Sequence, residues 1–303
     1  MVGCGRMGLP MAERLLVARL PVRAFDAAES ARRAAAESGA IPAVTPADAA
    51  CGADVVITML PNSATVRSAA TGDDGILTGL RPGALWLEMT SSSPDVTKEL
   101  AGAAEEAGAE LLDAPVSGGP AGARAGTLTV MLGGPADRVE RARPVLEHLG
   151  EELVHVGDRP GDGDVAKTVN NMLSATNLAA AAEALALGMR AGLAPDRLID
   201  CINGGSGASH ASRVKLAGHV LTGRFSAGFT IGQYLKDLHI AQETAAAHRV
   251  ATPVNAVALA VWTGLAARGA SDADHTRVAD LVVRDAGLRP DWNSIPTTED
   301  EHR

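Results

Sequence analysis

A glycine pattern near the start of the chain constrains the fold more than any other feature. Residues 2–8 read Val-Gly-Cys-Gly-Arg-Met-Gly, a G-x-G-x-x-G motif that leads into helix-forming residues. Glycines at this spacing allow a tight strand-to-helix turn and let backbone N–H groups approach a pyrophosphate. An acidic residue about twenty positions later, at the end of the next strand, can hold ribose hydroxyls, and Asp26 lies there. We therefore expect a dinucleotide to be bound by Gly3, Gly5, Arg6, Met7, Gly8 and Asp26.

The first half of the chain alternates short apolar runs with helical segments. The expected strands are residues 22–25, 55–60, 84–89, 110–113, 128–132 and 153–156. Thr45 before Pro46 predicts a helix start, and Gly108 predicts a helix end. Alternation of this kind predicts an α/β domain with a doubly wound, mainly parallel sheet of the Rossmann type.

The pattern changes after residue 158. Residues 157–164 are rich in glycine, proline and aspartate, which predicts a linker, and no strand pattern follows them. Helices are expected over residues 164–190, 195–203, 230–248, 253–268 and 272–285. We therefore expect a dinucleotide-binding domain over residues 1–160, an all-helical substrate and dimerisation domain over residues 161–290, and a polar tail over residues 291–303.

Composition excludes several classes of function. The net charge of -9 offers no basic face for a nucleic acid. The three cysteines form no disulfide pattern, and the eight histidines show no ligand-like spacing, so no metal site is expected. No signal peptide pattern precedes the glycine motif, and charged residues interrupt the most apolar helical stretch, which is too short to span a membrane. These features favour a cytoplasmic enzyme that works without a membrane.

Two further motifs follow expected strands, where ligands bind in an open α/β sheet. Residues Met59, Leu60 and Pro61 end one strand, and Ser91 follows another, although each also fits an ordinary turn. A third strand leads into Ser117, Gly118 and Gly119. Successive glycines can expose N–H groups to an anion, so this loop can hold a substrate carboxylate or be a plain connecting loop.

Lys167 and Asn171 lie four residues apart on an expected helix and therefore share one face. A lysine can act as a general acid or base, whereas a lysine on a helix surface is more often only solvated. The chain contains only four lysines among 27 basic residues, and arginine cannot release its proton, which favours a chemical role for Lys167. Lys236, in the apolar stretch 234–238, either reaches a cofactor or substrate or pairs with a carboxylate.

Five motifs in this order resemble the 3-hydroxyisobutyrate dehydrogenase family, a group of β-hydroxyacid dehydrogenases related to 6-phosphogluconate dehydrogenase. The motifs cover residues 3–12, 59–61, 113–119, 167–171 and 236–238. The resemblance implies a Rossmann domain followed by a helical domain through which subunits pair as a homodimer or higher homo-oligomer. It also implies the site roles, with Ser91 near the cofactor, Ser117 to Gly119 and Asn171 on the substrate, Lys167 as catalyst, and Lys236 lining the site.

The implied reaction moves hydride between NAD(P) and a small 3-hydroxy acid such as 3-hydroxyisobutyrate, with Lys167 as general acid/base. An alternative on the same scaffold is an NADPH-dependent reductase of tartronate or succinic semialdehyde. An imine reductase or a non-catalytic dinucleotide-binding scaffold would lack the lysine, so Lys167 argues against both. Asp26 favours NAD over NADP, which remains possible because Arg32 and Arg33 can bend back toward the ribose.

The chain departs from the family pattern at two places. Only Met1 and Val2 precede Gly3, so the first strand is truncated, and we expect the native polypeptide to begin upstream. Residues 88–91 read Glu-Met-Thr-Ser, where the family commonly has an aspartate first and serine before threonine.

Overall fold

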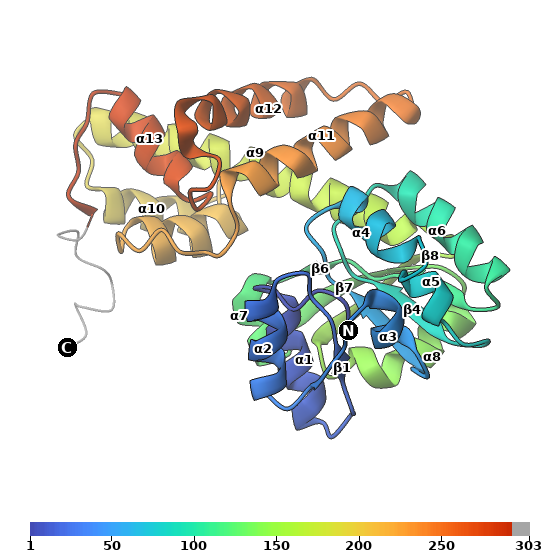
Figure 1. Cartoon of the computed structure of the whole chain (residues 1–303). Helices are drawn as coiled ribbons and strands as arrows, with labels where there is room; N and C mark the ends of the chain where they lie inside the picture. The colour runs from blue at the N-terminus through green and yellow to red at the C-terminus, as the bar shows by residue number, and fades with distance from the viewer. Residues whose placement is uncertain (293–303) are drawn as a thin grey trace. The chain divides into compact units, whose positions relative to one another are not determined.

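The chain divides into two units in the computed structural model, which describes residues 1–292 (Figure 1). The first unit comprises Met1–Lys167, and the second begins at Thr168. Residues 293–303 of the expected tail lie outside the described residues. Helix α9, Asp162–Arg190, contains the last residues of the first unit and the first residues of the second.

The first unit alternates strands and helices as expected. Its strands are β1 (Arg23–Ala24), β2 (Ile41–Pro42), β3 (Val55–Thr58), β4 (Leu85–Glu88), β5 (Glu110–Asp113), β6 (Val116–Ser117), β7 (Leu128–Gly133) and β8 (Gly150–Gly157). Its helices before α9 are α1 (Gly8–Val17), α2 (Glu29–Glu37), α3 (Pro46–Ala50), α4 (Ser63–Ala70), α5 (Ile76–Gly79), α6 (Pro94–Glu106), α7 (Gly119–Ala125) and α8 (Ala136–Leu146).

The sheet is mixed, with a parallel part that carries the site motifs. Strands β3, β4 and β5 are parallel neighbours, β7 runs antiparallel to β5, and β8 lies parallel to β7. Val2 forms parallel bridges with Phe25 and Thr58, so it joins the β1–β2 pair to β3. Two residues thus occupy the central strand position, and the carboxyl ends of Val2, β1, β3, β4 and β5 meet at one edge.

A cavity lies at the amino end of the central strand position, which Met1 and Val2 occupy. A cavity of about 400 Å³ is lined by Met1, by Val22 beside β1, and by Asp54 and Val55 at the start of β3. It therefore lies at the amino ends of the strands, opposite the edge that carries the glycine turn.

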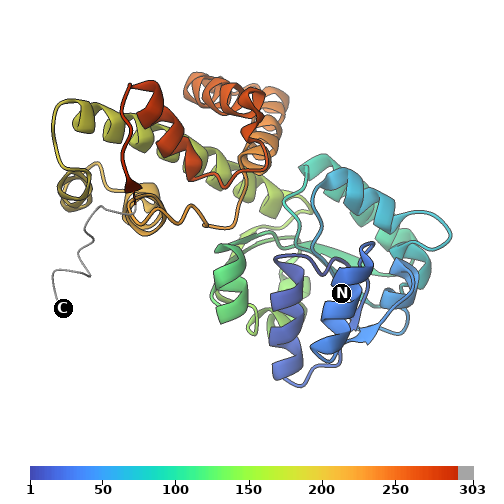
Figure 2. The same cartoon turned by 60° about the vertical axis from the view of Figure 1, so that its left-hand side comes forward.

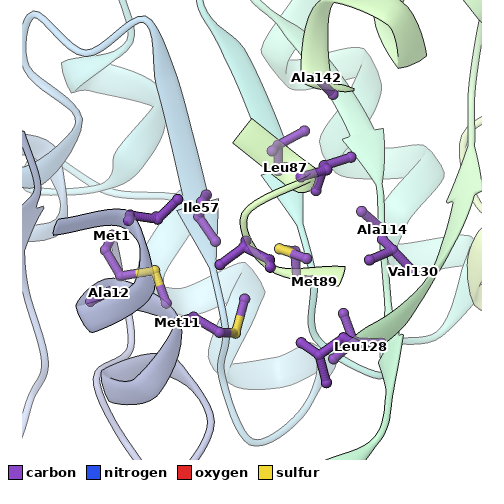
Figure 3. Close-up of a cluster of buried hydrophobic side chains, with 14 of the residues drawn as sticks. Met1, Met11, Ala12, Ile57, Leu87, Met89, Ala114, Leu128, Val130 and Ala142 are labelled. Atoms are coloured by element: carbon purple, nitrogen blue, oxygen red, sulfur yellow. The ribbon is translucent and has the colours of Figure 1, made fainter. Parts of the chain in front are cut away.

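Both faces of the sheet are buried because successive strand residues alternate between two cores. In β4, Leu85 and Leu87 belong to the core that contains residues of α1, α2, α7 and α8. Trp86 points to the other core, which contains residues of α3 to α6. Figure 3 shows side chains of the first core, including Met1, Met11 and Leu87.

The sequence-based strands are close to the observed ones, with instructive differences. β2 and β6 were not expected, because two residues carry no readable alternation. The expected linker at 157–164 is instead the end of β8, a turn, and the first residues of α9. Thr45 accepts a hydrogen bond from the Asp48 N–H at 3.0 Å, which confirms the predicted helix start, and Gly108 has a positive φ of 77° after α6.

The second unit is helical, as Figure 2 shows for the segments coloured yellow to red. After α9 it contains α10 (Pro195–Gly204), the π-helix η1 (Ala211–Val220), α11 (Ile231–Ala247), α12 (Pro253–Leu265), the short π-helix η2 (Ala266–Ala270) and α13 (Arg277–Asp285). η1 was not expected, and α13 begins five residues later than expected. Trp292, assigned from the sequence to the polar tail, is instead buried and donates a hydrogen bond to Asp280 at 2.7 Å.

Helix α9 supplies one face of the second core. Ala175, Leu178, Ala182 and Leu185 are fully buried at helical spacing, and they pack with residues of the other helices of this unit. By length and composition α9 could cross a membrane, contrary to the expectation from the sequence, but one such helix is weak evidence. The core helix of a water-soluble protein meets the same criterion, and the buried face of α9 fits that explanation.

Candidate active site

The glycine turn after Val2 is tight enough to require two of its glycines. Gly3 has a φ of 95°, and a Cβ there would lie 2.2 Å from the Met59 carbonyl oxygen. A Cβ on Gly8, at the start of α1, would lie 2.0 Å from the Gly3 carbonyl oxygen. Side chains at either position would push the first turn of α1 away from the sheet edge.

The middle of this turn is open instead. A Cβ on Gly5 would meet no atom within 4 Å, and Gly5 and Arg6 are exposed. Within residues 1–292, the backbone N–H groups of Gly5, Arg6 and Met7 donate no hydrogen bond. Unsatisfied N–H groups at the start of a helix form a site for an anion. The turn therefore has the shape and the donors that a pyrophosphate requires.

Asp26 lies beside the same turn, where β1 ends. Its carboxylate accepts hydrogen bonds from the Cys4 N–H at 2.8 Å and from the Ala28 N–H at 2.9 Å. Arg32, on α2, donates to the Asp26 carbonyl oxygen at 2.6 Å. The acid expected to hold a ribose is thus fixed to the glycine turn, and one of the two arginines considered from the sequence does bend back to it.

The other strand-end motifs lie at this edge of the sheet. Met59 and Leu60 follow β3, and the Leu60 N–H donates to the Thr90 hydroxyl at 3.0 Å after β4. Ser117 ends β6, and Gly118 and Gly119 follow with positive φ angles of 130° and 63°. Only glycine adopts these conformations readily, so other residues would strain the backbone of this loop.

Three buried carboxyl groups lie below this edge. Glu88 ends β4, Asp113 ends β5 and Asp164 lies in the first turn of α9, and none of the three is exposed. Burial raises the pKa of Glu88 to about 7 and that of Asp113 to about 6. Burial, reinforced by the neighbouring Glu88 and Asp113, raises the pKa of Asp164 well above its usual value. Burial therefore makes all three carboxyls harder to ionise than carboxyls on the surface.

Two of these carboxyls hold the start of α9 in place. Asp113 accepts hydrogen bonds from the N–H groups of Gly161 at 2.8 Å and Asp164 at 3.0 Å. The Asp164 carboxyl in turn accepts from the Thr97 hydroxyl of α6 at 2.6 Å. Lys167 follows Asp164 by three residues and is only 8% exposed. The first turn of α9, and with it the backbone of Lys167, is thus fixed to the end of β5.

One turn later α9 enters the second unit, where Asn171 takes part in a polar cluster. The Asn171 amide donates to the Asp237 carboxylate of α11 at 2.5 Å. The Lys236 ammonium lies 3.0 Å from the other Asp237 oxygen, with its side chain 27% exposed. The structure therefore brings Asn171 and Lys236 together through a carboxylate that the sequence interpretation had not assigned a role.

Sequence reasoning missed Asp237 although it lies inside the K-D-L motif. Its contact with Asn171 joins residues 66 positions apart, which no spacing rule reveals. It also missed the role of Asp113 and Asp164 in fixing α9. The sequence offers one signal for Asp164, because Asp162 and Asp164 both stand at the start of the helix that carries Lys167. No group of three or more His, Cys, Asp or Glu that could hold a metal ion occurs within residues 1–292.

Comparison with known proteins identifies both units. The family model for the NAD binding domain of 6-phosphogluconate dehydrogenase matches residues 1–157. The model described as NAD-binding of NADP-dependent 3-hydroxyisobutyrate dehydrogenase matches residues 161–282. These two matches meet where α9 begins.

Similar proteins cover nearly the whole chain. The NAD-dependent L-serine dehydrogenase of Pseudomonas aeruginosa is 40% identical over 92% of this chain and 96% of its own. The 2-(hydroxymethyl)glutarate dehydrogenase of Eubacterium barkeri is 38% identical over 95% of each chain. The solved structure of Mycobacterium tuberculosis 3-hydroxyisobutyrate dehydrogenase with L-serine is 36% identical, with a TM-score of 0.85 over 93% of this chain and 97% of that one. The chain therefore belongs to the 3-hydroxyisobutyrate dehydrogenase family of nicotinamide-dependent oxidoreductases.

Proposed function

We propose that this enzyme oxidises a small 3-hydroxy acid of the 3-hydroxyisobutyrate type, with Lys167 accepting the hydroxyl proton. The observation that carries the proposal is the position of Lys167. It is buried, its helix turn is fixed by Asp113 and Asp164, and it precedes the Asn171–Asp237–Lys236 cluster by one turn of the same helix. A lysine can take up and release a proton in such a place, whereas arginine cannot.

The residues of the first unit fit a nicotinamide dinucleotide. The N–H groups of Gly5, Arg6 and Met7 would hold its pyrophosphate, and Asp26 would hold its adenosine ribose. Met59 to Pro61 and Ser91 would line the same edge. When bound, the dinucleotide supplies hydride exchange with the carbinol carbon, while the protein positions the reactants and manages one proton.

The polar residues around the catalyst have separate tasks in this scheme. Asp237 fixes the orientation of the Asn171 amide. The amide would then hold the substrate oxygen or Lys167 in line. Lys236, paired with Asp237, adds positive charge for an anionic substrate or cofactor. Ser117, Gly118 and Gly119 would bind the substrate carboxylate through a hydroxyl and backbone N–H groups.

NAD is the preferred cofactor in this proposal, and the reverse reaction remains compatible with the same residues. A carboxylate at Asp26 binds ribose hydroxyls and repels a 2′-phosphate. Arg32 supports NADP as a second cofactor, because its guanidinium lies at the Asp26 carbonyl oxygen. Reduction of tartronate or succinic semialdehyde would use the same groups, with Lys167 donating the proton.

Nicotinamide absorbance provides the decisive assay. Purified enzyme is followed at 340 nm with 3-hydroxyisobutyrate, L-serine, glycerate, threonate and 3-hydroxypropionate, each with NAD and with NADP. Turnover of at least one 3-hydroxy acid is expected, with the higher kcat/KM for NAD. Failure with every acid, and with the matching semialdehydes in the reverse direction, would overturn the proposed activity.

The proposal includes self-association of a cytoplasmic enzyme. Val169, Leu173 and Leu187 on α9 are 53%, 57% and 73% exposed, an apolar stripe opposite the face that enters the core. A second copy of the chain would cover such a stripe. Light scattering coupled to size-exclusion chromatography should give at least twice the mass of one chain, and Leu173→Glu should lower it.

A further inference from the structure

Thr97 is a buried polar residue of α6 to which the proposed reaction gives no role. Its hydroxyl donates a hydrogen bond to the Asp164 carboxyl of α9 at 2.6 Å, and neither side chain is exposed. The two residues are 67 positions apart in the sequence, and both belong to the first unit. A hydrogen bond between buried groups is stronger than one in water, so this contact holds the first turn of α9 to α6.

The Asp164 carboxyl also reaches the loop that follows β4. Its other oxygen accepts a hydrogen bond from the Ser92 N–H at 3.3 Å. Ser92 is buried and follows Ser91, which the proposed function places beside the dinucleotide. Asp164 therefore connects α9 to α6 through Thr97 and to a candidate cofactor loop through Ser92. A carboxyl group can do this because its two oxygens accept from separate donors.

The loop after β4 is joined in turn to the start of α4. The Ser92 hydroxyl donates to the Ser63 hydroxyl at 3.0 Å, and the Ser93 N–H donates to the same oxygen at 2.8 Å. Ser63 is the first residue of α4, which closely follows the motif at residues 59–61. The two loops that line the proposed dinucleotide site are thus part of one hydrogen-bonded network, and Asp164 attaches α9 to that network.

The backbone of the same turn packs closely against the sheet. A Cβ on Gly163 would lie 2.5 Å from the Met131 carbonyl oxygen of β7 and 2.8 Å from a carboxyl oxygen of Asp113. This close approach fixes the point at which α9 starts. The bonds of the Asp164 side chain then set the direction of the helix face that carries it. Lys167 follows three residues later on that face, so a rotation of the turn would move the lysine directly.

From these contacts we propose that Thr97 and Asp164 are positioning residues, whose hydrogen bond keeps Lys167 at the distance from the dinucleotide loops that the reaction requires. The inference rests on the proposed function and adds two residues to the groups on which it depends. Both side chains are fully buried, so they act through the turn of α9 and not on the substrate itself. A displacement of about 1 Å in a reacting group can cost about 10²-fold in rate, so the loss of this one bond should affect kcat far more than binding.

Substitutions at Thr97 separate the effect of its hydroxyl from that of its shape. Thr97→Val keeps the branched shape and removes the hydroxyl, whereas Thr97→Ser keeps the hydroxyl. We expect Thr97→Val to lower kcat about 10- to 100-fold, with KM and the dissociation constant for NAD within about threefold of wild type. Thr97→Ser should retain most of the wild-type kcat. Thr71→Val is the control, because the exposed Thr71 hydroxyl donates to the Arg67 carbonyl oxygen at 3.0 Å in the same unit.

A fall in kcat of less than about tenfold in Thr97→Val would overturn the proposal. Equal losses in Thr97→Val and Thr97→Ser would overturn it as well, because packing alone would then explain the effect. Titration with NAD counts the intact dinucleotide sites in each preparation and so separates a slower enzyme from a smaller folded fraction. If Thr97→Val does not fold, Thr97→Ala takes its place, since alanine and serine at this position differ only in the hydroxyl. Equal kcat values for those two variants would again reject the role of the hydrogen bond.

Hydrogen exchange tests the positioning of α9 without turnover. With saturating NAD, the backbone amides of residues 164–167 should exchange at least about tenfold faster in Thr97→Val than in wild type, whereas those of α8 should not change. If the wild-type enzyme turns over no 3-hydroxy acid, the proposed reaction fails, and faster exchange would still support the attachment of α9 through Thr97. Unchanged exchange at residues 164–167 would reject that attachment whatever the activity.

Discussion

The two units prepare their parts of the site by different means. In the first unit the backbone makes the candidate contacts, through the N–H groups after Gly3 and the loop at Gly118 and Gly119. In the second unit side chains do so, through Asn171 and Lys236, which both contact the Asp237 carboxylate of α11. Backbone recognition leaves a glycine pattern in the sequence, whereas side-chain recognition leaves single polar residues that only the fold connects.

This difference predicts how each unit should respond to mutation. A change in the first unit should alter which dinucleotide binds and how tightly. A change in the second unit, or at Lys167 and the residues that position it, should alter the chemical step and the choice of substrate while dinucleotide binding persists.

The largest expected effect is that of Lys167→Ala. Loss of a general acid/base costs roughly 10²- to 10⁴-fold in rate, so kcat should fall by that factor. The dissociation constant for NAD, measured by fluorescence titration, should stay within about threefold of wild type, because the glycine turn is untouched.

Lys167→Arg separates proton transfer from charge. Arginine keeps the charge but holds its proton, so this variant should fail almost as badly as the alanine variant. Retention of more than about a tenth of wild-type kcat would instead make Lys167 an electrostatic anchor, contrary to its proposed role.

Asp237→Asn should have the next largest effect. The change removes the charge that Asn171 and Lys236 share, and charged hydrogen bonds contribute roughly 1.5–3 kcal/mol. We expect kcat/KM to fall about 10- to 100-fold with little change in the affinity for NAD. Asp285→Asn is the control, because Asp285 forms an exposed pair with Arg268 at 2.7 Å. Equal losses in both variants would refute a specific role for Asp237.

Asp26→Asn should change the choice of cofactor by a smaller factor. The amide keeps the shape but removes the repulsion of a 2′-phosphate, so the NADP-to-NAD ratio of kcat/KM should rise about tenfold, or about 1.4 kcal/mol. Adding Arg32→Ala should reverse much of this gain, if the guanidinium at the Asp26 carbonyl oxygen contacts the phosphate. No change in the ratio for Asp26→Asn would show that the carboxylate does not face the ribose.

The smallest expected effect is a pH-dependent change in the melting temperature when Glu88 is replaced. Because burial raises the folded-state pKa of Glu88 to about 7, its contribution to stability is full below the unfolded value near 4.5 and is lost as pH rises through about 7. Glu88→Gln, which cannot ionise, should therefore raise Tm by a few °C at pH 9 and by about 1 °C or less at pH 5. Glu99→Gln, at an exposed pair with Arg67, should show no inflection near pH 7. Parallel Tm curves for wild type and Glu88→Gln would contradict the raised pKa.

The sequence predicted the positions of features that depend on local conformation. The glycine turn, Asp26 at the end of β1, and the helix that carries Lys167 each depend on local conformation or short spacing. Gly3 and Gly8 are required because a Cβ at either would overlap backbone atoms, which is a local constraint that the motif records.

The features that depend on long-range packing were not predicted. The contact between Asn171 and Asp237 and the carboxyl cluster of Glu88, Asp113 and Asp164 join residues from separate elements. η1 was missed because π-helical residues do not follow the spacing of an α-helix.

The placement of Tyr234 gives the second unit an optical signal of its own. Light absorbed by the only tyrosine passes readily to an indole at 5.0 Å, so tyrosine emission should be quenched by Trp262 in the native protein. Unfolding of the helical unit would separate the rings and restore that emission, whereas Trp86 reports on the sheet of the first unit. Near-ultraviolet spectra can therefore follow the surroundings of Tyr234 without any added label.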